Sequence, residues 1–252
     1  MMAYALELQN VVKRFGPTTA VDDLTLRIGS GAFVGLLGRN GAGKSTTINM
    51  CTGMLKPSAG SIRVLTMDMK SDALAVKRRI GVMAQDEGFL DCLTGAQYLH
   101  FTGRVYGLDD NRIAERSAEL LETLDLAPAP GALIREYSYG MKKKLALCAA
   151  LIHGPEMLFL DEPFEGIDPV TGRTIKDILL GLHRKGITVL MSSHILDVVE
   201  KLCPQIAIID RGRLRGFGTM EEIRQIHGSN ASLEQLFIEL MGGAKRGELS
   251  WL

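Results

Sequence analysis

Hydrophobic and polar residues alternate over the first part of the chain, and short, wholly apolar runs follow. The alternation extends from Leu6 to Ile28 around Gly16-Pro17, a pattern typical of two antiparallel strands and a turn. Stretches of helical length separate the later runs, which are Ala32–Leu37, Ile80–Ala84, Met157–Leu160, Thr188–Met191 and Ile206–Ile209, with a further strand expected at Gly60–Leu65. We therefore predict an α/β fold with a mostly parallel sheet and an N-terminal antiparallel β subdomain.

Between Thr94 and Ala150 the apolar residues instead recur at helical spacings, and the Pro128–Gly131 cluster breaks the pattern. The recurring residues are Leu99, Leu120, Leu121, Leu124, Leu145 and Cys148. We expect an all-helical insert at about residues 86–155 within a domain of residues 1–227. Residues 228–252 contain an amphipathic stretch and a polar end, which predicts a C-terminal helix and a tail.

Composition narrows the function classes. The 29 basic and 29 acidic residues balance, so no overall charge attracts the chain to nucleic acid or anionic lipid. No apolar run reaches the length of a membrane span, and Met1–Asn10 lacks the pattern of a signal peptide. The widely separated Cys51, Cys92, Cys148 and Cys203 are typical of buried, reduced thiols in a cytosolic protein. Any membrane role is therefore expected to come through a partner.

The segment Gly38–Ser45 reads Gly-Arg-Asn-Gly-Ala-Gly-Lys-Ser, a complete phosphate-binding loop between a predicted strand and a predicted helix. Its glycines let backbone N–H groups converge on phosphates at a helix N-terminus. Lys44 is expected to reach the β- and γ-phosphates, and the Ser45 hydroxyl to ligate Mg²⁺. The nucleotide-binding residues predicted here are Gly38, Arg39, Asn40, Gly41, Ala42, Gly43, Lys44, Ser45 and Thr46.

A second carboxylate source follows the Met157–Leu160 run, where Asp161 and Glu162 are adjacent. Asp161 is expected to hold Mg²⁺ directly or through water, and Glu162 to polarise the attacking water. The alternative is an exposed acidic pair at a strand end. Three further residues, Gln85, Asp168 and His194, lie where they can orient water or sense a γ-phosphate, although each taken alone is equally well a surface or hydrogen-bonded polar residue.

Together, the order of these residues from Leu6 to Phe237 resembles the ATP-binding-cassette ATPases, which have a P-loop NTPase core. The discriminating segment is Tyr137-Ser-Tyr-Gly-Met141, which is similar to the family signature Leu-Ser-Gly-Gly-Gln and lies upstream of Leu158–Glu162. The resemblance implies two subunits packed head to tail, with ATP and Mg²⁺ between the loop of one and Ser138 and Gly140 of the other.

The resemblance also implies individual roles. Gln85 is the lid-loop glutamine, which contacts the metal and takes part in catalysis with Glu162. His194 is the switch histidine, also catalytic, and Asp168 is a dimer-contact aspartate. Phe15 falls where the family stacks an aromatic ring on adenine; a hydrophobic turn residue is the alternative.

The chain departs from the family at several positions. Tyr137, Tyr139 and Met141 replace the signature's leucine, first glycine and glutamine, and the bulky Tyr139 must point away from the nucleotide. The run Lys142–Lys144 is either a solvated helix face or an attraction for a phosphate from a second subunit. Arg39 stands at a position that is usually neutral in the family, and the sequence offers no interpretation of it.

Within the family, the segments Glu87–Thr94, Arg104–Leu108 and Ser232–Phe237 resemble the ATPase subunits of bacterial ABC-2 type exporters. This likeness implies a separate polytopic membrane permease and a second ABC ATPase subunit, identical or different. It also implies a cytoplasmic location on the inner face of the cell membrane. The permease is expected to touch residues 85–108, where Phe89, Leu90 and Leu93 form an apolar cluster or belong to the core.

Three alternatives stay open at this point. One is an ABC importer ATPase, and another is a non-catalytic regulatory cassette, against which Glu162 and His194 argue. The third is a soluble cassette ATPase acting on nucleic acid or ribosomes. Such proteins usually carry two cassettes or a long coiled-coil insert, and this chain shows neither. Its neutral charge also argues against direct nucleic-acid binding.

Overall fold

The computed structural model describes residues 4–85, 88–126, 131–227 and 232–240. Its first two strands, β1 (Tyr4–Phe15) and β2 (Thr18–Gly29), pair antiparallel across the turn predicted at Gly16-Pro17. With β4 (Ala59–Val64) and β5 (Met67–Asp68) they form a sheet of order β2-β1-β4-β5. Alternate residues are buried from Leu24 to Ile28 of β2, which explains the period-two pattern there, whereas register shifts along β1 make its burial less regular.

A second sheet, of order β10-β9-β3-β8-β7-β6, forms the centre of the molecule. Five of its strands are parallel and match the predicted apolar runs: β3 (Phe33–Leu37), β6 (Ile80–Met83), β7 (Met157–Leu160), β8 (Thr188–Ser193) and β9 (Gln205–Asp210). The antiparallel β10 (Arg213–Gly218) completes it. Because β3, β8, β7 and β6 are consecutive neighbours, the loops that follow them meet at one edge of the sheet.

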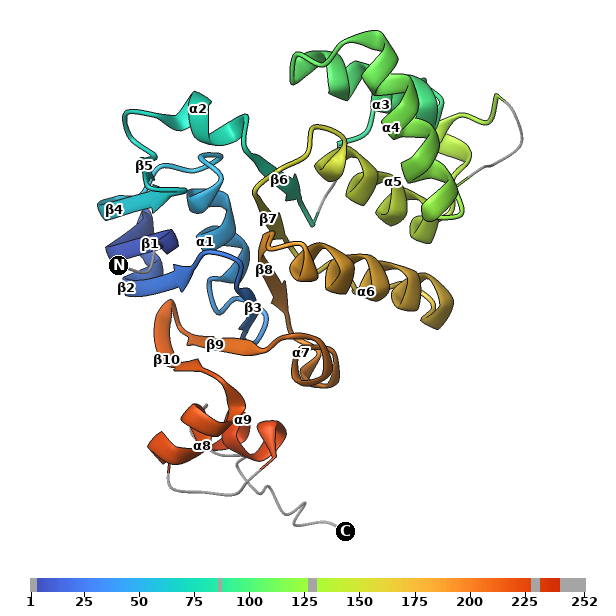
Figure 1. The fold of residues 1–252 in the computed structure, drawn as a ribbon. Helices are drawn as coiled ribbons and strands as arrows, with labels where there is room; N and C mark the ends of the chain where they lie inside the picture. The colour runs from blue at the N-terminus through green and yellow to red at the C-terminus, as the bar shows by residue number, and fades with distance from the viewer. Residues whose placement is uncertain (1–3, 86–87, 127–130, 228–231, 241–252) are drawn as a thin grey trace.

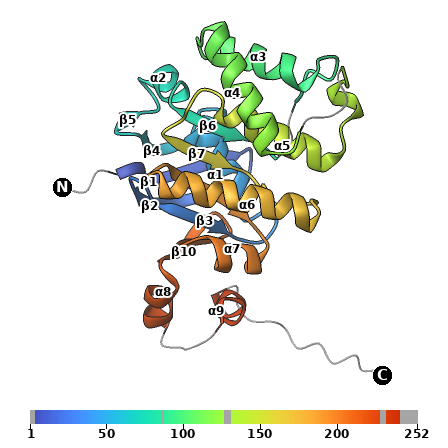
Figure 2. The ribbon, with the colours of Figure 1, turned by 45° about the vertical axis from the view of Figure 1, so that its right-hand side comes forward.

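Helices cover both faces of this sheet. On one face, α1 (Lys44–Cys51) contributes Ile48, Met50 and Cys51 to a core that both sheets share. The short helix α2 (Ala73–Lys77) contacts β6, the edge strand of the central sheet. On the other face, α6 (Pro169–Arg184) lies across the strands in Figure 2, with α7 (Leu196–Leu202) next to it. The predicted C-terminal helix is α9 (Leu233–Leu240), which packs with α8 (Met220–His227) and α7.

The predicted all-helical insert consists of α3 (Gly95–Val105), α4 (Asp110–Thr123), a 3₁₀ turn at Ile134–Glu136 and α5 (Tyr139–Leu151). It forms a separate group beside β6 and β7 in Figure 1. A capping box at Thr94 and Gln97 begins α3. The fold class is therefore as predicted, whereas the division into domains at residues 86–155 and 227 stays a prediction.

Two expectations about side-chain burial are corrected. Cys51, Cys148 and Cys203 are buried, and desolvation raises the pKa of each thiol to about 12, but Cys92 is exposed because it lies in the loop before α3. Of the expected apolar cluster, only Leu90 is exposed, at 44%. Phe89 and Leu93 pack against the core instead.

In the described part of the chain, no helix has the length and apolar character needed to cross a bilayer.

Candidate functional site

The loop between β3 and α1 has the backbone conformation that a phosphate cradle requires. Gly41 and Gly43 have φ of +77° and +104°, a region that favours glycine. A Cβ added at Gly43 would also lie 2.5 Å from the carbonyl oxygen of Ala20. Helix α1 begins at Lys44 without a side-chain cap, so its first N–H groups and its dipole are directed at the loop.

A cavity of about 380 Å³ opens at this loop. Its lining residues come from β2, the loop, the start of α1 and the ends of β6 and β7: Ala20, Asn40, Gly41, Gly43, Lys44, Ser45, Thr46, Gln85, Glu162 and Glu165. The volume is within the range of small-molecule sites. The parallel sheet thus brings the loop together with Gln85 and Glu162, which are remote from it in the sequence.

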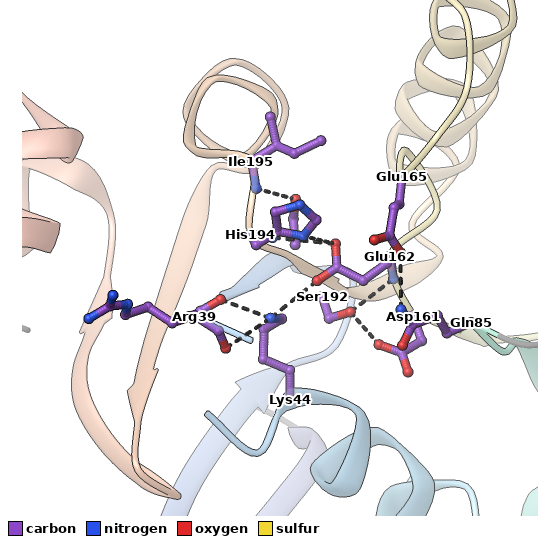
Figure 3. A network of polar contacts seen from close by, with 11 residues as sticks. Arg39, Lys44, Gln85, Asp161, Glu162, Glu165, Ser192, His194 and Ile195 are labelled. Atoms are coloured by element: carbon purple, nitrogen blue, oxygen red, sulfur yellow. Dashed lines mark hydrogen bonds and ion pairs between the residues drawn. The ribbon is translucent and has the colours of Figure 1, made fainter. Parts of the chain in front are cut away.

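Lys44 and Glu162 face one another in the cavity (Figure 3). The Lys44 ammonium is 3.2 Å from Glu162 Oε1 and donates to the carbonyl oxygen of Gly38 at 2.8 Å. Their side chains are only 6% and 4% exposed, so each charge depends on the other for compensation. The alternative of an exposed acidic pair is therefore wrong, since Asp161 is also just 3% exposed.

Ser192, in β8, and His194, directly after that strand, form hydrogen bonds with Asp161 and Glu162. Glu162 Oε2 accepts a hydrogen bond from the backbone N–H of His194 at 3.3 Å and lies 3.0 Å from His194 Nδ1. Ser192 bridges the pair, since its Oγ accepts from the Glu162 N–H at 2.9 Å and donates to Asp161 Oδ1 at 2.5 Å. Glu162 has φ of +49°, which is strained for a non-glycine residue and frequent at functional sites. Ser192 was not predicted as a site residue from the sequence.

Gln85 approaches the cavity from the end of β6 and is held at two points. Its Nε2 donates to Glu165 Oε2 at 3.0 Å, and its backbone carbonyl accepts from Lys143 Nζ at 3.4 Å. Neither partner was identified as a site residue from the sequence. For Glu165, its place in the loop that follows the acidic pair was the available signal, because that loop returns to the same sheet edge.

The predicted signature residues lie outside the cavity of their own chain. Ser138 is the exposed N-cap of α5, and its Oγ accepts from the N–H of Met141 at 3.2 Å. A Cβ added at Gly140 would meet Thr171 Oγ1 at 3.3 Å, so this glycine packs against the start of α6. Asp168 caps that helix, and hydrogen bonds from Thr171 lower the pKa of its carboxyl group.

Tyr139 and the run Lys142–Lys144 are packed against neighbouring residues to different degrees. The Tyr139 ring is 51% exposed and packs on Gly166, where an added Cβ would lie 3.0 Å from the ring. Lys143 and Lys144 are 2% and 8% exposed, so a solvated lysine face is wrong. The physical reason is that α5 packs against α3, α4 and β6 together. Only Lys142 reaches the surface, where it lies 3.5 Å from Asp91.

Besides Ser138, Gly140 and Asp161, four more of the predicted binding residues do not line the cavity. Gly38 comes before the lining residues of the loop in the chain, and an added Cβ there would lie 2.6 Å from the carbonyl oxygen of Ile209. The Arg39 side chain points away from Lys44 in Figure 3, although its carbonyl oxygen accepts from Lys44 Nζ at 3.3 Å. Ala42 is buried. Phe15 is 47% exposed at the end of β1, with Lys13 Nζ 4.9 Å from its ring centroid.

The donor groups fit the predicted metal. Within the described ranges, no cluster of three or more His, Cys, Asp or Glu side chains has the geometry to hold a metal ion by itself. Ser45 and Gln85, which line the cavity, and Asp161 behind it all offer oxygen atoms. Mg²⁺ prefers oxygen ligands and typically takes only one or two protein groups together with phosphates and water.

Comparisons with known proteins agree with this geometry. A family model described as "ABC transporter" matches residues 21–165. The chain is 40% identical to the daunorubicin/doxorubicin resistance ATP-binding protein DrrA of Streptomyces peucetius, over 90% of this chain and 68% of that protein. It is 37% identical to the linearmycin resistance ATP-binding protein LnrL of Bacillus subtilis (strain 168), over 86% and 70%.

Solved structures show the same fold. The structure of an ATP-binding subunit of an ABC transporter superposes with a TM-score of 0.87 and is 29% identical, covering 94% of this chain and 99% of that one. A dimeric ATP-binding cassette bound to ADP and Pi has a TM-score of 0.79 over 85% of this chain and 98% of that one. At 23% identity, this second likeness carries the fold alone.

Proposed function

We propose that this chain, which belongs to the ABC transporter family, hydrolyses ATP to drive export through a separate membrane permease. The observation that carries the proposal is the convergence of Lys44, Ser45, Gln85 and Glu162 on one cavity. The names of the relatives favour an antibiotic-like small molecule as the exported substrate, because two of them are resistance proteins for daunorubicin or linearmycin.

In this proposal the loop binds the phosphates of ATP through its N–H groups and Lys44. The Lys44 ammonium contacts Glu162 at 3.2 Å, so a terminal phosphate competes with that carboxylate for it. Once released, Glu162 Oε1 is able to accept a proton from the attacking water. Mg²⁺, held by Ser45, Gln85 and Asp161, would supply charge neutralisation on the phosphate oxygens.

His194 and Ser192 keep Glu162 oriented during this exchange. Their contacts reach Oε2 and the backbone N–H of Glu162 and leave Oε1 to face Lys44. A carboxylate held on one oxygen can direct the other at water without losing its position. His194 therefore acts in the proposal as a positioning residue, and its contact with the terminal phosphate is what the family resemblance implies.

The proposed site is completed by a second subunit packed head to tail, a copy of this chain or a related cassette. Ser138 and Gly140 do not line their own cavity, so a role in binding ATP requires them to act on the other subunit. Two exposed apolar side chains, Tyr139 and Val170, lie beside them and suit a contact surface. Val170, the second residue of α6, is 75% exposed.

Replacing Ser138 with arginine tests the second subunit. We expect the Ser138→Arg variant to bind nucleotide as a monomer but to lose ATP hydrolysis, since a bulky cation would stand where the signature meets the other subunit. Phosphate release by the assembled complex is the measurement. The matched control is Ser71→Arg, the same change at an exposed serine near α2. Normal hydrolysis by Ser138→Arg would favour a monomeric P-loop enzyme instead.

The permease is proposed to dock on the outer face of α3 and the loop before it. Phe101 and Val105 are one turn apart on α3 and are 50% and 67% exposed, and Leu90 is 44% exposed. This surface follows Gln85 in the chain, so movement at the cavity has a short path to it. The location implied is peripheral, on the inner face of the membrane.

Charged substitutions on α3 test this docking surface. Val105→Glu and Phe101→Glu, made singly, should leave nucleotide binding unchanged and move the protein from the membrane fraction to the supernatant of its own cells. Ile238→Glu is the control, because Ile238 is a 40% exposed apolar residue on α9. Membrane association that survives both α3 variants would exclude this face of α3.

A further inference from the structure

The cavity contains more negative side-chain charge than a phosphate site needs. Its charged lining residues are Lys44, Glu162 and Glu165, one cation and two carboxylates. Lys44 and Glu162 compensate each other at 3.2 Å. The charged side chains of the lining therefore sum to one negative charge, and among the described residues Glu165 is the lining carboxylate whose hydrogen-bond partner is not a cation.

The contacts of Glu165 do not neutralise it. Among the described residues, the side-chain partner of its carboxylate is the uncharged amide of Gln85, at 3.0 Å. The Lys143 ammonium contacts the Gln85 backbone carbonyl instead, and the Arg39 side chain points away from Lys44 and Glu165 (Figure 3). Glu165 as a residue is half-buried and lines the cavity, although its bond to Gln85 is exposed, so its charge acts at short range on whatever the cavity binds.

We propose that Glu165 is a specificity-determining residue that makes the cavity accept metal-loaded nucleotide and reject metal-free nucleotide. The proposal rests on the ATP-binding function proposed above. A free nucleoside triphosphate carries about four negative charges near neutral pH, and a divalent cation cancels two of them. The Glu165 carboxylate repels the free form more strongly and attracts the cation of the loaded form.

The position of Gln85 links this charge to the metal site. The amide that bonds Glu165 belongs to the same side chain whose oxygen is proposed to contact Mg²⁺. With Nε2 directed at Glu165, Oε1 is oriented away from that carboxylate, which leaves it available as a metal ligand. Glu165 thus acts on the cation through its charge and through the orientation of Gln85.

Binding measurements with and without metal test the proposal on the isolated full chain. Calorimetry with a non-hydrolysable ATP analogue gives one Kd in Mg²⁺ and one in EDTA. For Glu165→Gln, the ratio of the EDTA Kd to the Mg²⁺ Kd should fall on the order of tenfold below the wild-type ratio. Glu165→Asp, which keeps the charge, should retain most of the wild-type ratio.

The control is Glu119→Gln, which removes one carboxylate from the exposed face of α4. A Glu165→Gln ratio equal to the control ratio would overturn the inference, because a merely structural residue changes both constants alike. Failure of the wild-type chain to bind the analogue in either buffer would instead refute the proposed function. The two failures are therefore distinguishable.

Discussion

Glu162→Gln is expected to lower ATP turnover by about two to four powers of ten while Mg·ATP binding persists. The amide keeps the size of the side chain and its contact with His194, which lies 3.0 Å from Oε2. It removes the negative charge that polarises water. Steady-state phosphate release is the measurement, and Glu200→Gln, at an exposed carboxylate on α7, is the matched control.

The contact between Glu162 and Lys44 adds a second expectation for this variant. Since the carboxylate competes with a terminal phosphate for the Lys44 ammonium, the neutral amide should let nucleotide bind more tightly. Turnover then falls while affinity rises, and size-exclusion chromatography with Mg·ATP should show more dimer than for the wild type. Near-normal turnover would place the catalytic base elsewhere, with His194 the first residue to test.

Lys44→Ala is expected to abolish productive ATP binding, because it removes the cation that pairs with the terminal phosphates. The same change leaves the Glu162 carboxylate, which is 4% exposed, without its ammonium partner. Removing one member of a buried ion pair typically costs about 3–5 kcal/mol of unfolding free energy. Calorimetric binding and urea denaturation measure the two effects separately.

A double variant separates binding from stability. Combining Lys44→Ala with Glu162→Gln removes both buried charges, so stability should recover toward the wild type. ATP binding should stay absent, since the phosphates still lack their cation. An unchanged nucleotide affinity in the single Lys44→Ala variant would refute the assignment of the loop.

Several features of the fold were not predictable from local pattern. The strand β10 (Arg213–Gly218) mixes charged residues with two glycines, and it forms because it pairs with β9 at the sheet edge. The lysines of α5 read as a solvated face, yet Lys143 is 2% exposed. Its burial depends on the packing of α3, α4 and β6 against α5, and the sequence of one segment does not specify that packing.

The sequence by itself determined the phosphate loop and the strand pattern. Positive φ at Gly41 and Gly43, the start of α1 at Lys44 and the burial of β3 all follow from residues adjacent in the chain. The conformational freedom of glycine, the start of a helix and the burial of an apolar run are local properties. Residues adjacent in the chain are therefore sufficient to predict them.

Only the tertiary structure decided how the charged groups of the site are paired. Glu162 contacts Lys44 and His194, and Glu165 contacts Gln85 across 80 positions of the chain. These pairs exist because β3, β8, β7 and β6 lie side by side and end at one edge. Strand order is set by packing of the whole sheet, and for that reason the residue that gives the cavity its uncompensated charge was not identified from the sequence.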